Sequence, residues 1–97
     1  MHYQVRFPTA SLQKKFEKEL DCLPEEIRDE IIRKTEALSH DPRPSGEPKI
    51  KPPVEVYNYT AQYRLRIGKY RVLYDVNDAT KTVWIFALRK RGESTYK

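Results

Sequence analysis

The sequence predicts an α+β fold: an N-terminal strand, an antiparallel helical hairpin, and then a three- to four-stranded antiparallel sheet packed on the helices. Apolar residues that recur every three or four positions between residues 9 and 41 predict the helices. Alternation of apolar and polar residues predicts strands before and after them. A Gly-Lys pair between two alternating runs, at Gly68 and Lys69, is typical of a two-residue hairpin turn. We expect one domain over residues 1–97, with one modest core.

The composition excludes several classes of protein. With 38% hydrophobic and 34% charged residues, the chain is typical of soluble globular proteins. No apolar run approaches the length of a membrane span, and no signal peptide is visible, so we expect a cytoplasmic protein. The single cysteine, Cys22, cannot form an internal disulfide, and its place between Leu20 and Leu23 predicts a small buried side chain.

Local signals bound the N-terminal elements. His2 to Phe7 alternates and predicts a strand. Thr9 or Ser11 can cap the first helix, and Pro24 suits the first turn of the second, which Asp41-Pro42 ends. The buried stripes are expected to consist of Leu12, Phe16, Leu20 and Leu23 in the first helix and Ile27, Ile31, Thr35 and Leu38 in the second.

The C-terminal half contains the remaining strands. Five prolines predict an irregular crossover from His40 to Pro53. Val54 to Tyr59 is either a short strand or the lead-in to the hairpin. Asn77 to Lys81 is expected to be a turn. Thr82 to Leu88 is apolar on both faces, which indicates a central strand.

The predicted hairpin gathers three arginines on one face. If its strands are Tyr63 to Ile67 and Tyr70 to Val76, alternation places Arg64, Arg66 and Arg71 together, away from the apolar and aromatic side chains. In this register Arg66 lies opposite Arg71. Like charges that face each other across a strand pair are destabilising, so we infer that an anion binds there.

Pairing of the last strand with Tyr70 to Val76 extends this surface. We expect Val72 near Phe86 and Tyr74 near Trp84, with these four residues forming the core face against the helices. Arg71 is then expected near Ala87, with Arg89 two residues beyond. The expected basic patch consists of Arg64, Arg66, Arg71 and Arg89, with Lys90, Arg91 and Tyr96 on the segment beyond it and Tyr57 or Tyr59 near its rim.

The charge distribution favours a polyanionic partner. Residues 1–48 hold 8 Lys/Arg and 10 Asp/Glu, net −2, whereas residues 49–97 hold 11 and 4, net +7. Clustered cations are the footprint of phosphate binding, although a solvated basic surface is the simpler alternative. Guanidinium groups bind phosphates and aromatic rings stack on bases, so the mixture favours single-stranded nucleic acid over a simple anion.

The element order and two phrases, YRLRIGKYRVLYDV and VWIFALRKRGESTYK, resemble the RelE/ParE superfamily of small toxins from toxin–antitoxin modules. The likeness covers nearly the whole chain and implies a RelE-like fold and a cognate antitoxin, acidic where it covers the patch. RelE-like members are endoribonucleases that cut mRNA in the ribosomal A site and inhibit translation. ParE-like members act on DNA gyrase and lack the basic catalytic set. A toxin-like domain without chemistry is a further alternative.

The resemblance also assigns roles to residues of this chain. The family's catalytic positions fall on Arg64, Arg71 and Tyr96, and on Lys90 or Arg91, depending on how the RKRGES segment is aligned. We expect Arg66, Lys69 and Arg89 to bind RNA. One upstream basic position of the RelE pattern is Gln62 here.

The implied reaction is attack of the ribose 2′-hydroxyl on its own 3′-phosphate, which needs no metal or cofactor. Arginine suits stabilisation of the phosphorane charge, but it stays protonated and therefore serves poorly as an acid or base. His2 and His40 lie outside the basic region. Tyr96 and Lys90 are therefore the candidates for proton transfer.

Overall fold

The computed structural model describes residues 2–44, 49–50 and 52–90 of the 97. In chain order the described elements are β1 (Gln4–Arg6), α1 (Ala10–Asp21), α2 (Glu25–Glu36), the short 3-10 helix η1 (Ala37–Ser39), β2 (Val54–Val56), β3 (Tyr59–Ala61), β4 (Tyr63–Ile67), β5 (Tyr70–Asn77) and β6 (Thr82–Lys90).

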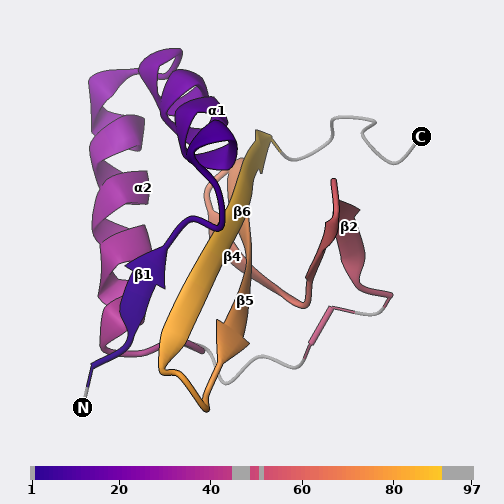
Figure 1. Ribbon diagram of the computed structural model, residues 1–97. Coiled ribbons are helices and arrows are strands. Elements are labelled where there is room, and N and C mark those ends of the chain that lie inside the picture. Colours follow the sequence, from indigo (N-terminus) through magenta and orange to yellow (C-terminus); the bar gives the residue numbers. More distant parts are fainter. Residues whose placement is uncertain (1, 45–48, 51, 91–97) are drawn as a thin grey trace.

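The main sheet contains four strands in the order β1-β6-β5-β4 (Figure 1). β4, β5 and β6 are antiparallel neighbours, whereas β1 pairs in parallel with the first three residues of β6. The predicted α+β fold is confirmed, and the parallel β1 makes the sheet mixed. β2 and β3 form a separate two-stranded sheet. The segment Val54 to Tyr59 therefore contains the first strand, the turn and the first residue of the second strand of a small hairpin.

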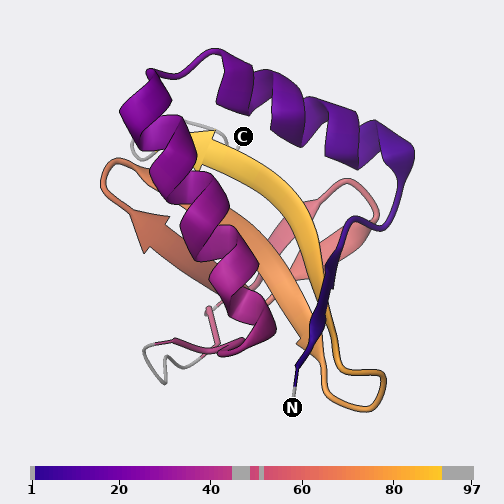
Figure 2. The same ribbon diagram turned by 90° about the vertical axis from the view of Figure 1, so that its left-hand side faces the viewer.

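Both helices cover one face of the main sheet and diverge from a short connection (Figure 2). Thr9 caps α1 as predicted, because its side chain accepts a hydrogen bond from the amide of Leu12 at 3.1 Å. Pro24 occupies the N-cap position of α2, one residue before the expected place. No helix in the described ranges is long and apolar enough to cross a membrane.

The main core lies between the helices and the sheet. Its buried residues are Phe16, Leu20, Ile31 and Leu38 from the helical part, and Tyr63, Leu65, Ile67, Val72, Tyr74, Val83, Ile85 and Leu88 from the sheet. The apolar face predicted for the hairpin is therefore confirmed: its residues belong to this core or pack against it.

Cys22 is exposed, so the prediction of a buried cysteine was wrong. The residue is the C-cap of α1 and keeps helical backbone angles. Because each helical residue advances by about 100°, a position two residues after buried Leu20 points to the opposite side of the helix.

A second, smaller core lies on the other face of the main sheet. Its buried residues are Leu12, Val56, Ala61, Leu73 and Phe86. The β2–β3 hairpin covers this region, and the Tyr59 ring stacks on Phe86 with centroids 5.2 Å apart. Tyr59 is therefore part of the packing, whereas Tyr57 in the β2–β3 turn is exposed.

The pairing of β5 with β6 differs from the prediction. Val72 pairs with Leu88 and Tyr74 with Ile85. Asn77, expected in the turn, pairs with Thr82 instead and shifts the register by one residue, and an irregularity between Leu73 and Tyr74 shifts it by one more. Phe86 falls in this bulge, where two residues of one strand oppose one of the other. Phe86 and Trp84 therefore belong to the second core, together with Leu12 of α1, and not to the main core between the helices and the sheet.

Candidate functional site

Three arginines lie side by side across three strands of the main sheet. Arg66 of β4 pairs with Arg71 of β5, as predicted, and Arg71 pairs with Arg89 of β6. Arg89 was expected two residues farther along, and the shorter turn and the bulge, one residue each, together bring it directly opposite Arg71. Directly paired side chains start from Cβ atoms only about 4.5–5.5 Å apart. We call Arg66, Arg71 and Arg89 the arginine row.

Arg64 lies beside this row on the same face. It pairs with Leu73, whose side chain belongs to the second core under the β2–β3 hairpin. The small hairpin thus covers one part of this face and leaves the arginine part open. A hollow of about 190 Å³ is lined there by Arg64, Arg66, Gly68, Tyr70 and Arg71.

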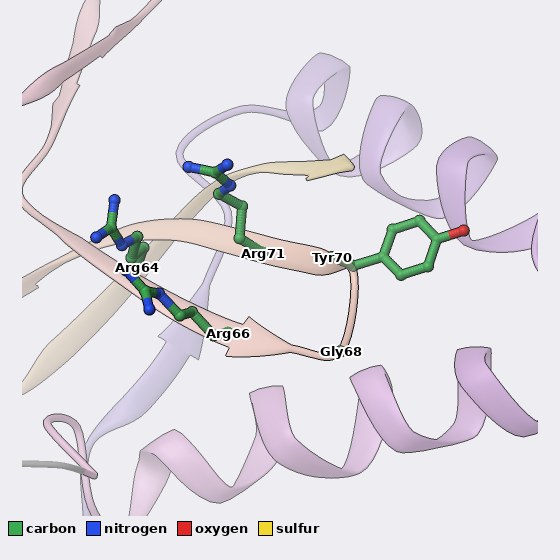
Figure 3. Close-up of a pocket in the computed structure, with 5 residues that line it drawn as sticks. All are labelled: Arg64, Arg66, Gly68, Tyr70 and Arg71. Carbon is green, nitrogen blue, oxygen red and sulfur yellow. The ribbon is translucent and has the colours of Figure 1, made fainter. Parts of the chain in front are cut away.

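Figure 3 shows how these side chains lie. The guanidinium groups of Arg64 and Arg66 extend from β4 and that of Arg71 from β5, all to the same side of the hairpin, whereas the Tyr70 ring points away from them. The turn between the strands is tight because Gly68 adopts a φ of 59°, a conformation that other residues rarely take. The two-residue turn thus sets the register that places Arg66 opposite Arg71.

The arginine row has no acidic partner within the described residues, whose ion pairs join Lys34 to Glu30 and Arg43 to Asp78. Arg71 and Arg89 are half-buried and Arg66 is exposed. Like charges on directly opposite residues of neighbouring strands are destabilising. A bound polyanion would relieve this repulsion.

The two lysines predicted for the site lie at the edge of this surface. Lys69 is exposed in the turn beside Gly68. Lys90 is exposed at the end of β6 and pairs with Tyr70, which packs against the main core. Alternation along the strand therefore directs Lys90 to the face opposite that of Arg89. Arg91 and Tyr96 lie outside the described residues.

A polar cluster that the sequence did not suggest lies on the helix side, near the β5–β6 turn. Arg43 donates to both carboxylate oxygens of Asp78, at 2.9 and 3.4 Å, and to the hydroxyl of Tyr63 at 3.2 Å. The Tyr3 hydroxyl also donates to Asp78, at 2.6 Å. The described residues of the crossover segment are irregular, as expected, and Arg43 ties the segment to Tyr63 of the sheet and Asp78 of the β5–β6 turn.

These contacts shift the pKa values of two side chains, Asp78 and Tyr3. The hydrogen bond from Tyr3 and then those from Arg43 hold the pKa of Asp78 below its usual range. The same hydrogen bond raises the pKa of the Tyr3 hydroxyl, because its proton is held by a carboxylate. In the described part of the chain, no group of three or more His, Cys, Asp or Glu side chains could hold a metal ion.

Comparison with known proteins identifies the family. A family model described as "ParE toxin of type II toxin-antitoxin system, parDE" matches residues 8–95. The chain belongs to the RelE/ParE toxin superfamily. It is a type II toxin. A comparison with curated proteins gives no match.

Solved structures of RelE toxins share the fold of this toxin. A chain of the archaeal RelE–RelB complex from Pyrococcus horikoshii is 29% identical, with a TM-score of 0.69 over 97% of this chain and 100% of its own. A chain of the RelBE2 toxin–antitoxin complex from Mycobacterium tuberculosis is 27% identical, with a TM-score of 0.64 over 94% and 100%. The isolated RelE toxin of E. coli, at 20% identity, has a TM-score of 0.63 over 96% and 88%.

Proposed function

We propose that this toxin is an endoribonuclease that cleaves mRNA in the ribosomal A site and thereby inhibits translation. The observation that carries the proposal is the arginine row, three cations on adjacent strands without acidic partners among the described residues. A row of guanidinium groups matches the phosphates of a single RNA strand laid across the sheet.

The proposed chemistry is attack of a ribose 2′-hydroxyl on the adjacent 3′-phosphate, with release of a 5′-hydroxyl and formation of a 2′,3′-cyclic phosphate. Arg71 occupies the centre of the row, so it is assigned to the scissile phosphate, where it stabilises the charge of the phosphorane. Arg64, lining the same hollow, clamps the RNA. Arg66, Lys69 and Arg89 bind neighbouring phosphates.

Proton transfer requires groups other than arginine, because the guanidinium stays protonated. Tyr96 and Lys90 are assigned to it, with Arg91 as a further cation. Because strand alternation directs Lys90 to the face opposite Arg89, Tyr96 is the first candidate. The ribosome contributes by holding the RNA with the 2′-oxygen in line with the leaving oxygen, so that a weak acid–base pair suffices.

A cognate antitoxin is the expected protein partner. The similar chains from P. horikoshii and M. tuberculosis belong to toxin–antitoxin complexes. An acidic segment of the antitoxin placed over the arginine row would relieve the repulsion and block the RNA site. Failure of the neighbouring-gene product to form a complex with the toxin would contradict this part of the proposal.

Binding to DNA gyrase is the second candidate function, favoured by the description of the matching family model. RNA cleavage is preferred because the chain carries the basic set that ParE-like members lack. The two candidate functions are distinguished by the process that the toxin stops: translation for an endoribonuclease, DNA supercoiling for a gyrase binder. Purified toxin is added to a cell-free translation extract and, separately, to a gyrase supercoiling assay.

We expect translation to stop, with new mRNA 5′ ends mapped to codons in the A site and 2′,3′-cyclic phosphate on the upstream fragments. Supercoiling should continue. Blocked supercoiling with intact mRNA would overturn the proposal in favour of gyrase binding. Continuation of both processes would support a toxin-like domain without chemistry.

A further inference from the structure

A second hollow, of about 400 Å³, adjoins the arginine row at the end of β6. One wall comes from α1, which runs beside β6 beyond the three residues that β1 covers (Figure 1). The remaining walls come from β6 and the β2–β3 turn. The lining residues are Leu12, Lys15, Phe16, Lys18, Glu19 and Cys22 of α1, Tyr57 of the turn, and Phe86, Ala87, Leu88 and Arg89 of β6.

Tyr57 is the unusual residue of this hollow. Its relative exposure is 66%, and it is the one large hydrophobic residue classed as exposed in the described part of the chain. Its φ of 57° lies in the left-handed region, which is unfavourable for a residue with a side chain. Because the ring is exposed, it adds no core packing that would offset the backbone strain, and strained residues of this kind cluster at functional sites.

The charges around the ring favour an anionic ligand. Lys15 Nζ lies 5.5 Å from the centroid of the Tyr57 ring, and Lys18 lines the same hollow. Arg89 belongs both to this hollow and to the arginine row, so the two surfaces are continuous. Three cations face one carboxylate, that of Glu19.

We propose that this hollow is a second nucleotide subsite, in which a base of single-stranded RNA stacks on Tyr57 while Lys15 and Lys18 bind the adjoining phosphate. An aromatic face beside cations is the combination that holds single strands without reading their sequence. A strand crossing the arginine row would reach the hollow through Arg89. The choice of RNA as the ligand rests on the function proposed above, but the subsite has its own test.

The test measures binding of a fluorescently labelled single-stranded RNA of about ten nucleotides to the toxin by anisotropy. Tyr57→Gly removes the ring and relieves the positive φ, so the variant should fold at least as well as the wild type. We expect its affinity for RNA to fall roughly tenfold, the effect of losing one stacked base. Tyr57→Phe keeps the ring and should bind like the wild type.

The lysines are tested through the salt dependence of binding. In a plot of log affinity against log salt concentration, Lys15→Gln should reduce the magnitude of the slope by about 0.7. This is the value for one phosphate contact on a single strand. Lys34→Gln is the matched control, because Lys34 lies on α2 and pairs with Glu30. It should leave both affinity and slope unchanged.

Each outcome separates the subsite from the cleavage proposal. Tyr57-dependent RNA binding by a toxin that cleaves no translated mRNA would support the subsite and overturn the nuclease. Cleavage that continues in Tyr57→Gly with unchanged RNA affinity would overturn the subsite alone. Absence of RNA binding by the wild type would overturn it as well, as would a Tyr57→Gly variant that binds RNA normally but loses the antitoxin.

Discussion

The two faces of the main sheet differ in what fills them. The helix-side face carries apolar and aromatic side chains from β4, β5 and β6, and α1 and α2 cover it. The opposite face is divided: the β2–β3 hairpin covers the half around Leu73 and Phe86, and the half nearest the β4–β5 turn carries the arginine row. Burial therefore stabilises the helix-side face and the half under the β2–β3 hairpin, whereas the remaining half carries like charges without acidic partners among the described residues.

This difference teaches where stability and activity reside. Substitutions on the helix side should lower the free energy of unfolding. Substitutions in the arginine row should affect activity and leave the fold unchanged or more stable, because they remove repulsion. Four substitutions test this division.

Arg71→Ala should lower the rate of mRNA cleavage by about 10²–10³-fold, the usual effect of removing one group that stabilises transition-state charge. Arg71→Lys should recover part of the rate, because it keeps the charge but loses the bidentate geometry. Cleavage is measured by primer extension in a translation extract, with circular dichroism as the check on folding. An unchanged rate in Arg71→Ala would contradict the assignment of the central arginine.

Ile31→Ala should lower the free energy of unfolding by about 2–5 kcal/mol, because Ile31 is fully buried in the main core. Urea denaturation measures the loss. At a temperature where the variant remains folded, its RNA affinity should equal that of the wild type. A large change in affinity with intact structure would show that the two faces are not independent.

Arg66→Gln should raise the free energy of unfolding by up to about 1 kcal/mol, because one of the two paired positive charges is removed. The gain should shrink in high salt, which screens exposed charges. Denaturation at low and high ionic strength measures both effects. A loss of stability at low salt would mean that Arg66 has a stabilising role beyond its charge.

Asp78→Asn tests the polar cluster, with the smallest effect. Because the folded-state pKa of Asp78 lies below its ordinary value of 3.8, its ionised form stabilises the fold above about pH 4, and this contribution is lost as the pH falls through the folded pKa. The difference in melting temperature between wild type and Asp78→Asn should therefore narrow below pH 4. A constant difference from pH 7 to pH 3 would contradict the assigned pKa direction.

Much of the fold followed from local patterns. Alternation and the Gly68 turn predicted β4, β5 and the pairing of Arg66 with Arg71, because a two-residue turn leaves a hairpin one register. Helical periodicity predicted α1 and α2, and Thr9 was named as one of two possible caps. Roles for Arg64, Arg71, Lys90, Arg91 and Tyr96 remain predictions, the last two outside the described residues.

Several features could not be predicted, because they depend on contacts between distant segments. The polar cluster around Arg43 joins side chains from four parts of the chain: Tyr3, Arg43, Tyr63 and Asp78. Nothing in the local sequence around Arg43 indicates these partners. The second strand of the small hairpin, β3, was missed because three residues carry too little alternation to mark a strand. Cys22 was placed by its neighbours' hydrophobicity, whereas its angle around the helix decides its exposure.

Strand alternation assigns every side chain to a face, so the local sequence is enough to tell which side of the hairpin is apolar and which is basic. The way in which β6 joins that hairpin depends on tertiary packing. The pairing of Asn77 with Thr82 and the bulge opposite Leu73 and Tyr74 each shift the register by one residue, and together they bring Arg89 directly beside Arg71. The physical reason is that packing selects the register: Phe86 is buried with Leu12 and stacked on Tyr59, and both contacts come from segments distant in sequence.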